Sequence, residues 1–252
     1  RAIAEARIKT DKIDSTILAH LLRTDLLPES YIPPREIRDI REVLRYRASL
    51  VSLRTALKNR LHAILSKNGI IMEYTDILGK RAKAQLKSLN VRSCYRLGID
   101  GYVRLTETLQ QLIDEVTKTI EGIVENNPQA KLLTTIHGIG YYSGLLIVSE
   151  IGDITRFSNA KKLCSYAGLV PSVYSSGDKT RHGSITKLGS KWLRWIMIEL
   201  SQHFAKSCSR LERMYTRISY KHGKNTARVA VAREMLKIIY SMLVNNRPFV
   251  KE

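Results

Sequence analysis

The sequence is poor in acidic residues, in cysteine and in long apolar runs. These shortages argue against an acidic protein, a disulfide-rich or zinc-binding protein, and a membrane-spanning protein, respectively. Its 252 residues include 23 Asp and Glu against 42 Lys and Arg, which leaves a formal net charge of +19. The three cysteines stand far apart and have no nearby cluster of histidines, which argues against a zinc site or a disulfide framework. We interpret Cys94, Cys164 and Cys208 as small buried residues in a reducing compartment.

No apolar run is long enough to span a bilayer, and the N-terminal residues lack the pattern of a secretory signal. The sequence therefore predicts a cytoplasmic protein without a membrane partner. It begins at Arg1 within a charged helical pattern, which is typical of a chain that starts inside a domain.

The excess of positive charge is the strongest compositional signal. A field of this sign attracts polyanions, and a protein tolerates it most easily when its partner is nucleic acid. With 44% hydrophobic residues the chain has enough apolar content to fold around a core. We expect a globular nucleic-acid-binding protein, and a merely cationic protein without chemistry stays open as the alternative.

Apolar residues at helical spacing predict a mostly α-helical chain. A first helix is expected within residues 1–27, and the three prolines of "LLPESYIPP" then indicate a linker. Long amphipathic helices are predicted over 36–67 and about 102–125, with a short helix between them. Together they favour an antiparallel helical arm. Arg47 and Arg54 interrupt the heptad pattern, so a plain helical bundle is an almost equal alternative.

The segment "ENNP" at 125–128 marks a boundary, and the pattern beyond it is again helical. Strand signals are scarce, and "GLVPSVYSS" at 168–176 is the best candidate. The expected helices cover about 129–136, 141–151, 159–167, 188–207, 209–221 and 224–245.

The segment "TTIHGIGYYSGLLIVSEIG", residues 134–152, has the pattern of a helix-hairpin-helix motif. Gly138 and Gly140 would let the backbone approach a phosphate, and the N–H groups that begin the next helix would point at it. Such contacts hold a duplex without reading its bases. A tight helical corner that needs two glycines is the structural alternative.

Two acids in "KTDKIDSTILAHLL", residues 9–22, are spaced for metal binding. Asp11 and Asp14 are three residues apart, so they lie on one helical face with Cβ atoms about 5–6 Å apart. Two carboxylates at this spacing can coordinate Mg²⁺ together. The plain alternative is a helix start, where acids are favoured by the helix dipole.

The stretch "VYSSGDKTRHGSITKLGSKWLR", residues 173–194, concentrates hydroxyls, glycines and cations around a single acid, Asp178. A serine is a weak nucleophile without a base or metal, and His182 is better interpreted as a phosphate donor or surface residue than as that base. A solvated cationic loop is the other interpretation. The candidate phosphate-binding cations are Lys179, Arg181, Lys187, Lys191 and Arg194.

These segments together resemble a known family. The run from "HGIGYYSGLLIVSEIG" to "GSITKLGSKWLRW", with "KTDKIDSTILAHLL" and "YIPP" upstream, is similar to the IS116/IS110/IS902 group of insertion-sequence transposases. The pilin-gene invertases are related to that group. The resemblance covers essentially the whole chain.

The resemblance implies three parts. Residues 1–34 would be the C-terminal end of a RuvC-like α/β domain and a linker, 35–128 a coiled-coil arm, and 129–252 a helical transposase domain with a serine nucleophile. The RuvC-like domain of the family carries an Asp, Glu, Asp, Asp metal site.

The resemblance also implies the roles of three residues. Asp11 and Asp14 match the last two acids of the metal site, and Ser176, directly before Gly177, matches the nucleophile. The first Asp and the Glu would lie before Arg1, so we expect this chain alone to bind nucleic acid with a steep salt dependence but not to recombine it. Tyr174 is a rival nucleophile that we interpret as a packing residue.

The partners implied by the resemblance are donor and target DNA, a guide RNA known as a bridge RNA, and further copies of the chain in a homo-oligomer. The implied cofactor is Mg²⁺. Recombination would proceed through a covalent bond between serine and DNA. A helix-hairpin-helix nucleic-acid-binding protein without catalysis is the alternative from a different class.

Overall fold

The computed structural model describes residues 10–26, 31–176 and 179–250. The chain divides into two compact units, Arg1–Pro34 and Arg35–Glu252, which are described separately. Ten α-helices, one 3-10 helix and a two-stranded sheet make up the regular structure of the described residues, so the prediction of a mostly helical chain is confirmed.

The first unit contains one described helix, α1 (Asp11–Arg23). Thr10 caps it, because the Thr10 hydroxyl accepts a hydrogen bond from the Ile13 N–H at 3.3 Å. No described residue of α1 is buried, and the Leu22 side chain is 68% exposed. The part of the expected 1–27 helix that precedes residue 10 lies outside the described residues.

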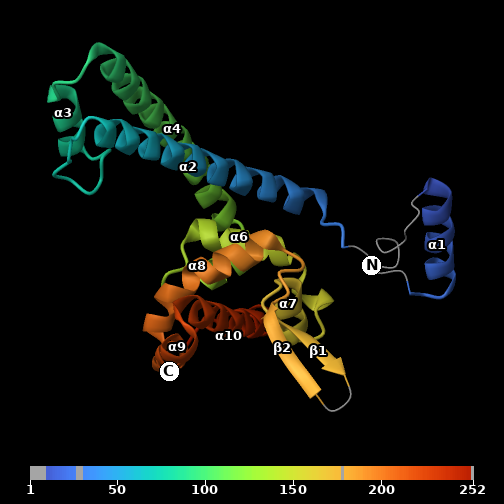
Figure 1. Cartoon of the computed structure of the whole chain (residues 1–252). Coiled ribbons are helices and arrows are strands. Elements are labelled where there is room, and N and C mark those ends of the chain that lie inside the picture. The colour runs from blue at the N-terminus through green and yellow to red at the C-terminus, as the bar shows by residue number, and fades with distance from the viewer. Residues whose placement is uncertain (1–9, 27–30, 177–178, 251–252) are drawn as a thin grey trace. The chain divides into compact units, whose positions relative to one another are not determined.

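In the second unit, α2 (Arg35–Lys67) and α4 (Ser93–Glu125) pack against each other as the helical arm seen in Figure 1. The two arginines that interrupt the heptad pattern join the helices. Arg47 donates to the Thr117 hydroxyl at 2.9 Å, and Arg54 donates to the Gln110 side-chain oxygen. These residues therefore contribute polar contacts along the seam of the arm.

The far end of the arm has a small core of its own around the short helix α3 (Lys80–Ser88). Helix α4 begins nine residues earlier than predicted, because Ile99 is buried in this core and Arg96 donates to the carbonyls of Leu86 and Leu89. Tertiary contacts thus extend the helix through a segment with a weak apolar stripe. The buried residues of this core are Leu61, Leu65, Ile77, Leu86 and Ile99.

The main body is a helical cluster around the buried helix α6 (Tyr141–Ile151). Its other helices are α5 (Pro128–Thr134), η1 (Ile154–Arg156), α7 (Ala160–Tyr166), α8 (Lys191–Ser207), α9 (Ser209–His222) and α10 (Lys224–Asn245). Leu44 of α2 and both Ile120 and Val124 of α4 are buried in the same core. The base of the arm is therefore built into the body.

The sheet is a hairpin of β1 (Pro171–Ser176) and β2 (Lys179–Ile185), which projects from the body in Figure 1. The strands are antiparallel, and a register shift occurs between Pro171 and Val173. The predicted strand β1 is confirmed. Strand β2 was not predicted, because "KTRHGSI" lacks the apolar alternation of a half-buried strand.

In the part of the chain that the structure describes, no helix combines the length and apolarity that crossing a membrane requires.

Candidate nucleic-acid site at the β1–β2 hairpin

Ser176 is the last residue of β1 and pairs with Lys179, the first residue of β2. The side chains of both residues, and residues 177–178 with Asp178, lie outside what the structure describes. Tyr174 and Ser176 share one face of the strand because strand side chains alternate. The Tyr174 side chain is 69% exposed, so the prediction that it is a packing residue is wrong.

The base of the hairpin is tied to the body by backbone hydrogen bonds. The Thr186 N–H donates to the Val170 carbonyl at 2.9 Å, and the Ser190 N–H donates to the Tyr166 carbonyl at 2.9 Å. Lys187, which has a positive φ of 55°, donates through its N–H to the Gly168 carbonyl at 3.3 Å. The hairpin thus stands on an anchored base.

Gly189 makes this anchoring possible because its backbone lies against the end of α7. Its φ is +80°, and a Cβ placed on it would lie 2.0 Å from the Tyr166 carbonyl oxygen. Only glycine fits such a conformation at so close an approach.

We expect Gly189→Ala to lower the free energy of unfolding about 1–3 kcal/mol more than Gly223→Ala does. Gly223 is the matched control, because its φ of +85° is similar but a Cβ there would meet nothing within 4 Å. Both variants carry the backbone strain, and only Gly189→Ala adds the clash with Tyr166. Urea denaturation followed by circular dichroism measures the difference, and equal losses in both variants would contradict the close approach.

A buried carboxylate joins three elements close to the segment that follows the hairpin. Glu150 of α6 has a side chain only 4% exposed, and its Oε1 is 3.2 Å from a guanidinium nitrogen of Arg45 in α2. Its Oε2 accepts a hydrogen bond from the Ser190 hydroxyl at 2.9 Å, and Ser190 caps α8. Arg41 of α2 donates to the Ser149 and Glu150 carbonyls at 2.9 and 3.1 Å. This network connects the arm to the segment that leaves the hairpin.

Glu150 was not predicted as a site residue, although a signal was present. It is the single acid in the helix "YYSGLLIVSEI", whose residues from Ser143 onward are all buried. An acid in such a run needs charged or polar partners, since an unpaired buried charge is very costly.

We expect Glu150→Ala to lower the free energy of unfolding by about 3 kcal/mol, because its removal leaves the Arg41 and Arg45 side chains without their counter-charge. The thermal midpoint should fall by roughly 6–12 °C. Glu107→Ala is the control, because the Glu107 pair with Lys83 is exposed and such pairs contribute little. An unchanged midpoint in Glu150→Ala would contradict a structural role for the network.

The glycines of the turn between α5 and α6 differ in their surroundings. Gly138 has a φ of +93°, and a Cβ there would lie 3.1 Å from the His203 Cβ, so this glycine serves the packing of the turn. Gly140 is the N-cap of α6, and a Cβ there would meet nothing within 4 Å. Its N–H donates to the Ser143 hydroxyl at 3.0 Å. The open backbone at Gly140 suits a phosphate contact, which stays a prediction.

The predicted phosphate-binding cations fall into two groups. Arg181 of β2, Lys187 and Lys191, the first residue of α8, are exposed. The Arg194 guanidinium is engaged, because it donates to the Ala167 carbonyl at 3.0 Å and so helps to hold the base of the hairpin. Arg181, which pairs with Tyr174, is the exposed cation of this set that lies near Ser176. Lys187 and Lys191 lie at the base of the hairpin, away from Ser176, and Arg194 has a structural contact there.

The predicted metal ligands are in the other unit. Asp11 and Asp14 lie in the first turn of α1, and Asp14 Oδ1 is shielded from solvent with no hydrogen-bond partner among the described residues. Carboxylate oxygens are the ligands that Mg²⁺ prefers, so the donor chemistry fits. The described residues contain no group of three or more His, Cys, Asp or Glu that could hold a metal, so this pair is part of a site at most.

The three cysteines are free thiols. Cys164 and Cys208 are buried as predicted, and burial raises the pKa of the Cys164 thiol. Cys94 is exposed, so the prediction that it is buried is wrong.

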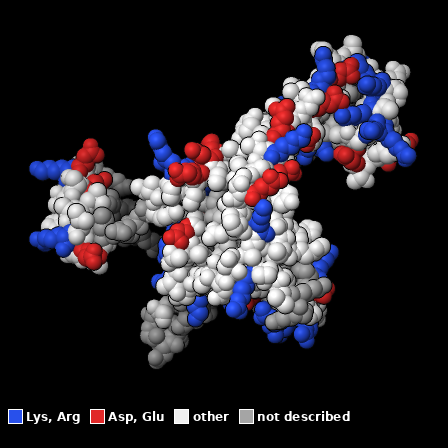
Figure 2. All heavy atoms as spheres, turned by 180° about the vertical axis from the view of Figure 1, so that it is seen from behind, with Lys and Arg blue, Asp and Glu red and all other residues white. Residues whose placement is uncertain are grey.

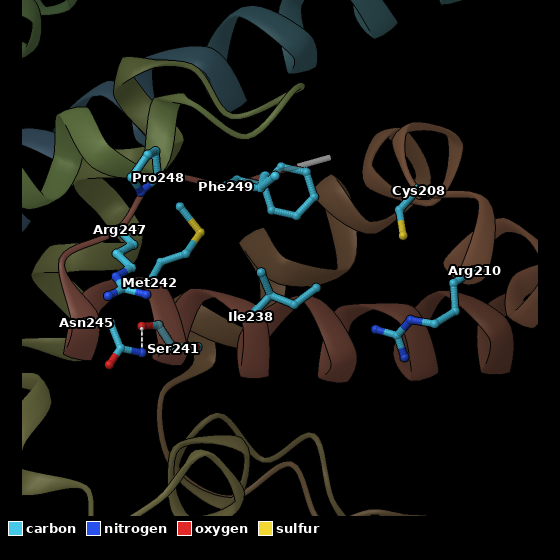
Figure 3. A pocket seen from close by; sticks show the side chains of 10 residues that line it. Cys208, Arg210, Ile238, Ser241, Met242, Asn245, Arg247, Pro248 and Phe249 are labelled. Atoms are coloured by element: carbon cyan, nitrogen blue, oxygen red, sulfur yellow. Dashed lines mark hydrogen bonds between the residues drawn. The ribbon is translucent and has the colours of Figure 1, made fainter. Parts of the chain in front are cut away.

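A pocket of about 350 Å³ lies between α10 and the C-terminal residues 247–250 (Figure 3). Met242, Ile238 and Phe249 supply apolar walls, while Arg247 and Arg210 lie at opposite ends of the row of lining side chains. The Phe249 N–H donates to the Thr135 hydroxyl at 3.3 Å, which attaches this segment to the turn before α6.

Comparison with known proteins assigns the family. Residues 130–217 match the family model described as "Transposase IS116/IS110/IS902 family". Residues 1–69 match a second model, for the DEDD domain of IS110 elements, described as "Transposase". A chain that carries both segments, on a basic and mostly helical fold, is a transposase-type protein. It belongs to the IS116/IS110/IS902 family of transposases.

Individual relatives agree with this assignment. The transposase of insertion sequence element IS1111A from Coxiella burnetii is 26% identical over 227 residues, which cover 85% of this chain and 61% of that protein. A probable family 20 transposase of Pseudomonas aeruginosa is 24% identical, with 94% and 73% covered. The pilin gene-inverting protein of Moraxella bovis is 29% identical, with 97% and 69% covered. The chain thus spans about three fifths of the length of the Coxiella protein.

Proposed function

We propose that this protein is a DNA transposase that cuts and rejoins DNA through a covalent bond to Ser176. The observation that carries the proposal is the match of both segments to one transposase family. Its support from the fold is the position of Ser176, at the end of a strand in a projecting hairpin with an anchored base and exposed cations.

In the proposed reaction the Ser176 hydroxyl oxygen attacks the scissile phosphorus. The serine O–P bond forms, the bond from phosphorus to one deoxyribose oxygen breaks, and that oxygen takes up a proton as the serine loses one. Arg181, opposite Tyr174 in the hairpin, neutralises phosphate charge near the nucleophile, and Lys187 at the hairpin base binds a phosphate farther along the DNA. Attack by a freed deoxyribose hydroxyl on the same phosphorus then rejoins DNA and releases Ser176.

Asp11 and Asp14 are the residues that would hold Mg²⁺. When bound, the ion supplies Lewis-acid polarisation of the scissile phosphodiester. The model of the DEDD domain, which matches residues 1–69, supports a divalent metal in this part of the protein.

The proposed partners are donor and target DNA, a guide RNA, and further copies of the chain, with the arm of α2 and α4 serving assembly. A net charge of +19 suits a protein that holds several nucleic-acid strands by their backbones. We place this activity in the cytoplasm. The division into a RuvC-like end at 1–34, an arm at 35–128 and a transposase domain at 129–252 is part of the same proposal.

A non-catalytic helix-hairpin-helix protein is the second candidate. The open backbone at Gly140, at the start of α6, favours it, since such a turn can bind phosphate without any chemistry.

A covalent adduct distinguishes the two candidates. The complete product of the gene is incubated with its element DNA, the element's RNA and Mg²⁺, and then denatured. The transposase predicts DNA that stays bound to protein after denaturation, with recombined product. The binding protein predicts full release of unaltered DNA, and that result would overturn the proposal.

A further inference from the structure

Helix α9 carries a row of cations on one face. Arg210, Arg213, Arg217 and Lys221 follow one another at spacings of three and four residues, so they line one side of the helix. All four are exposed. The row spans the twelve residues 210–221, about 16 Å along the helix axis. We name these four residues the α9 basic face.

The side of α9 next to this row is occupied by packing. Leu211 is fully buried, and Met214 is partly buried against the main core. The elements that α9 contacts are α8 and α10. The helix is thus held with its basic face toward solvent, and Figure 2 shows Lys and Arg side chains at the end of the body where α9 lies.

The basic face has no acidic partner. Glu212 is the one acid of α9, and it stands neither three nor four residues from any of the four cations. No ion pair among the described residues includes them. The Arg213 side chain donates to the Ser209 carbonyl at 3.4 Å, which leaves its charge unpaired.

Cations elsewhere on the surface are arranged differently. In α4, Lys118 has Asp114, Glu115 and Glu121 three or four residues away. At the end of the arm, Lys83 lies 2.8 Å from Glu107 and its hydrogen bond lowers the pKa of that carboxyl. Interspersed charges of this kind are ordinary for a solvated surface. The α9 basic face is not explained in this way.

Neighbouring like charges on a helix destabilise it, and a polyanion laid alongside reverses that cost. Duplex DNA carries about one charge per 1.7 Å of axis, so 16 Å of it presents roughly nine phosphates to four cations. Tyr220, 92% exposed next to the row, offers an aromatic ring to a base or sugar.

We propose that the α9 basic face binds the phosphate backbone of a nucleic acid, as a surface separate from the Ser176 hairpin. Figure 1 shows α9 on the opposite side of the body from β1 and β2. The binding does not depend on serine chemistry or on Mg²⁺. It would hold the nucleic acid away from the point of cleavage.

The test compares two variants that each lose three positive charges. The basic-face variant carries Arg213→Gln, Arg217→Gln and Lys221→Gln. The control variant carries Arg38→Gln, Arg104→Gln and Lys118→Gln, three exposed cations that have an acid three or four residues away. Any effect of net charge alone is therefore the same in both.

Affinity is measured without Mg²⁺ for a duplex DNA and for a hairpin RNA with the same number of phosphates, between about 50 and 200 mM salt. We expect the basic-face variant to reduce the slope of log affinity against log salt by about 2.7 on duplex DNA, as three lost phosphate contacts require. The control should change it by less than about 1. Circular dichroism checks that both variants are folded.

A reduced slope on either ligand supports the proposal, and the ligand on which it occurs identifies the nucleic acid that α9 holds. Arg213→Lys with Arg217→Lys should keep the parent slope, because the charges remain. Equal slopes for the basic-face and control variants on both ligands would overturn the proposal, and so would a parent chain that binds neither. Neither result bears on the Ser176 adduct, which is measured separately.

Discussion

Replacing Ser176 by alanine should abolish the covalent protein–DNA adduct and lower recombination by at least about 10³-fold, because no other hydroxyl replaces a missing nucleophile at the same position. The complete gene product is assayed with element DNA, RNA and Mg²⁺, and the adduct is counted after denaturation. DNA binding should stay within about twofold of the parent, since the serine contributes a reacting atom rather than a phosphate contact.

Two neighbouring residues serve as controls for Ser176. Ser175 lies on the opposite face of β1, so Ser175→Ala should retain the adduct. Tyr174 lies on the same face and is exposed, so it is the nearest rival. An adduct that survives Ser176→Ala and disappears in Tyr174→Phe would show that tyrosine is the nucleophile. Loss of the adduct on mild base treatment is expected for a phosphoserine linkage and not for a phosphotyrosine.

Replacing both Asp11 and Asp14 by asparagine should lower strand cleavage by about 10³-fold or more while sparing DNA binding. Several kcal/mol of metal-based stabilisation are lost with the two carboxylates, and each 1.4 kcal/mol is a factor of ten in rate. Cleavage is measured on element DNA across a Mg²⁺ series, and affinity is measured in parallel without Mg²⁺.

Asp25→Asn is the matched control for the aspartate pair. Asp25 lies just after α1, in the same compact unit as Asp11 and Asp14. Its φ is 53°, a value that asparagine also adopts, so Asp25→Asn removes a negative charge from this unit without a backbone penalty. It should leave cleavage unchanged. Unaltered cleavage in the double variant would contradict the proposed metal site, and weakened DNA binding would indicate a structural role for the two acids instead.

The helices of the main body were largely predictable because their apolar residues recur at helical spacing. Helices α6 and α10 have the predicted bounds, and α2 begins one residue before its predicted start. The start of α4 depended on burial of Ile99 against the end of α2, and sequence spacing does not contain that contact. Strand β2 forms because β1 pairs with it, although its own residues carry no strand pattern.

The candidate site was less predictable than the fold. Residue chemistry marked the cationic stretch 173–194, but Ser176 was chosen through the family resemblance and not through geometry. The anchors of the hairpin were invisible in the sequence, because Gly189 approaches Tyr166 and Glu150 meets Ser190 only after the chain folds. The positive charge of the segment that forms α9 can be read from the sequence. That no described acid of α8 or α10 pairs with it is known only from the way these helices pack.

The shared core at the base of the arm limits how this protein can be divided. Leu44, Ile120 and Val124 cover the same buried cluster as α6, although they belong to the arm. A fragment that starts after "ENNP" would expose that cluster to water and leave Glu150 without Arg41 and Arg45. The arm is thus a component of the body's stability as well as an extension from it, so we expect arm and body to unfold together as one cooperative unit.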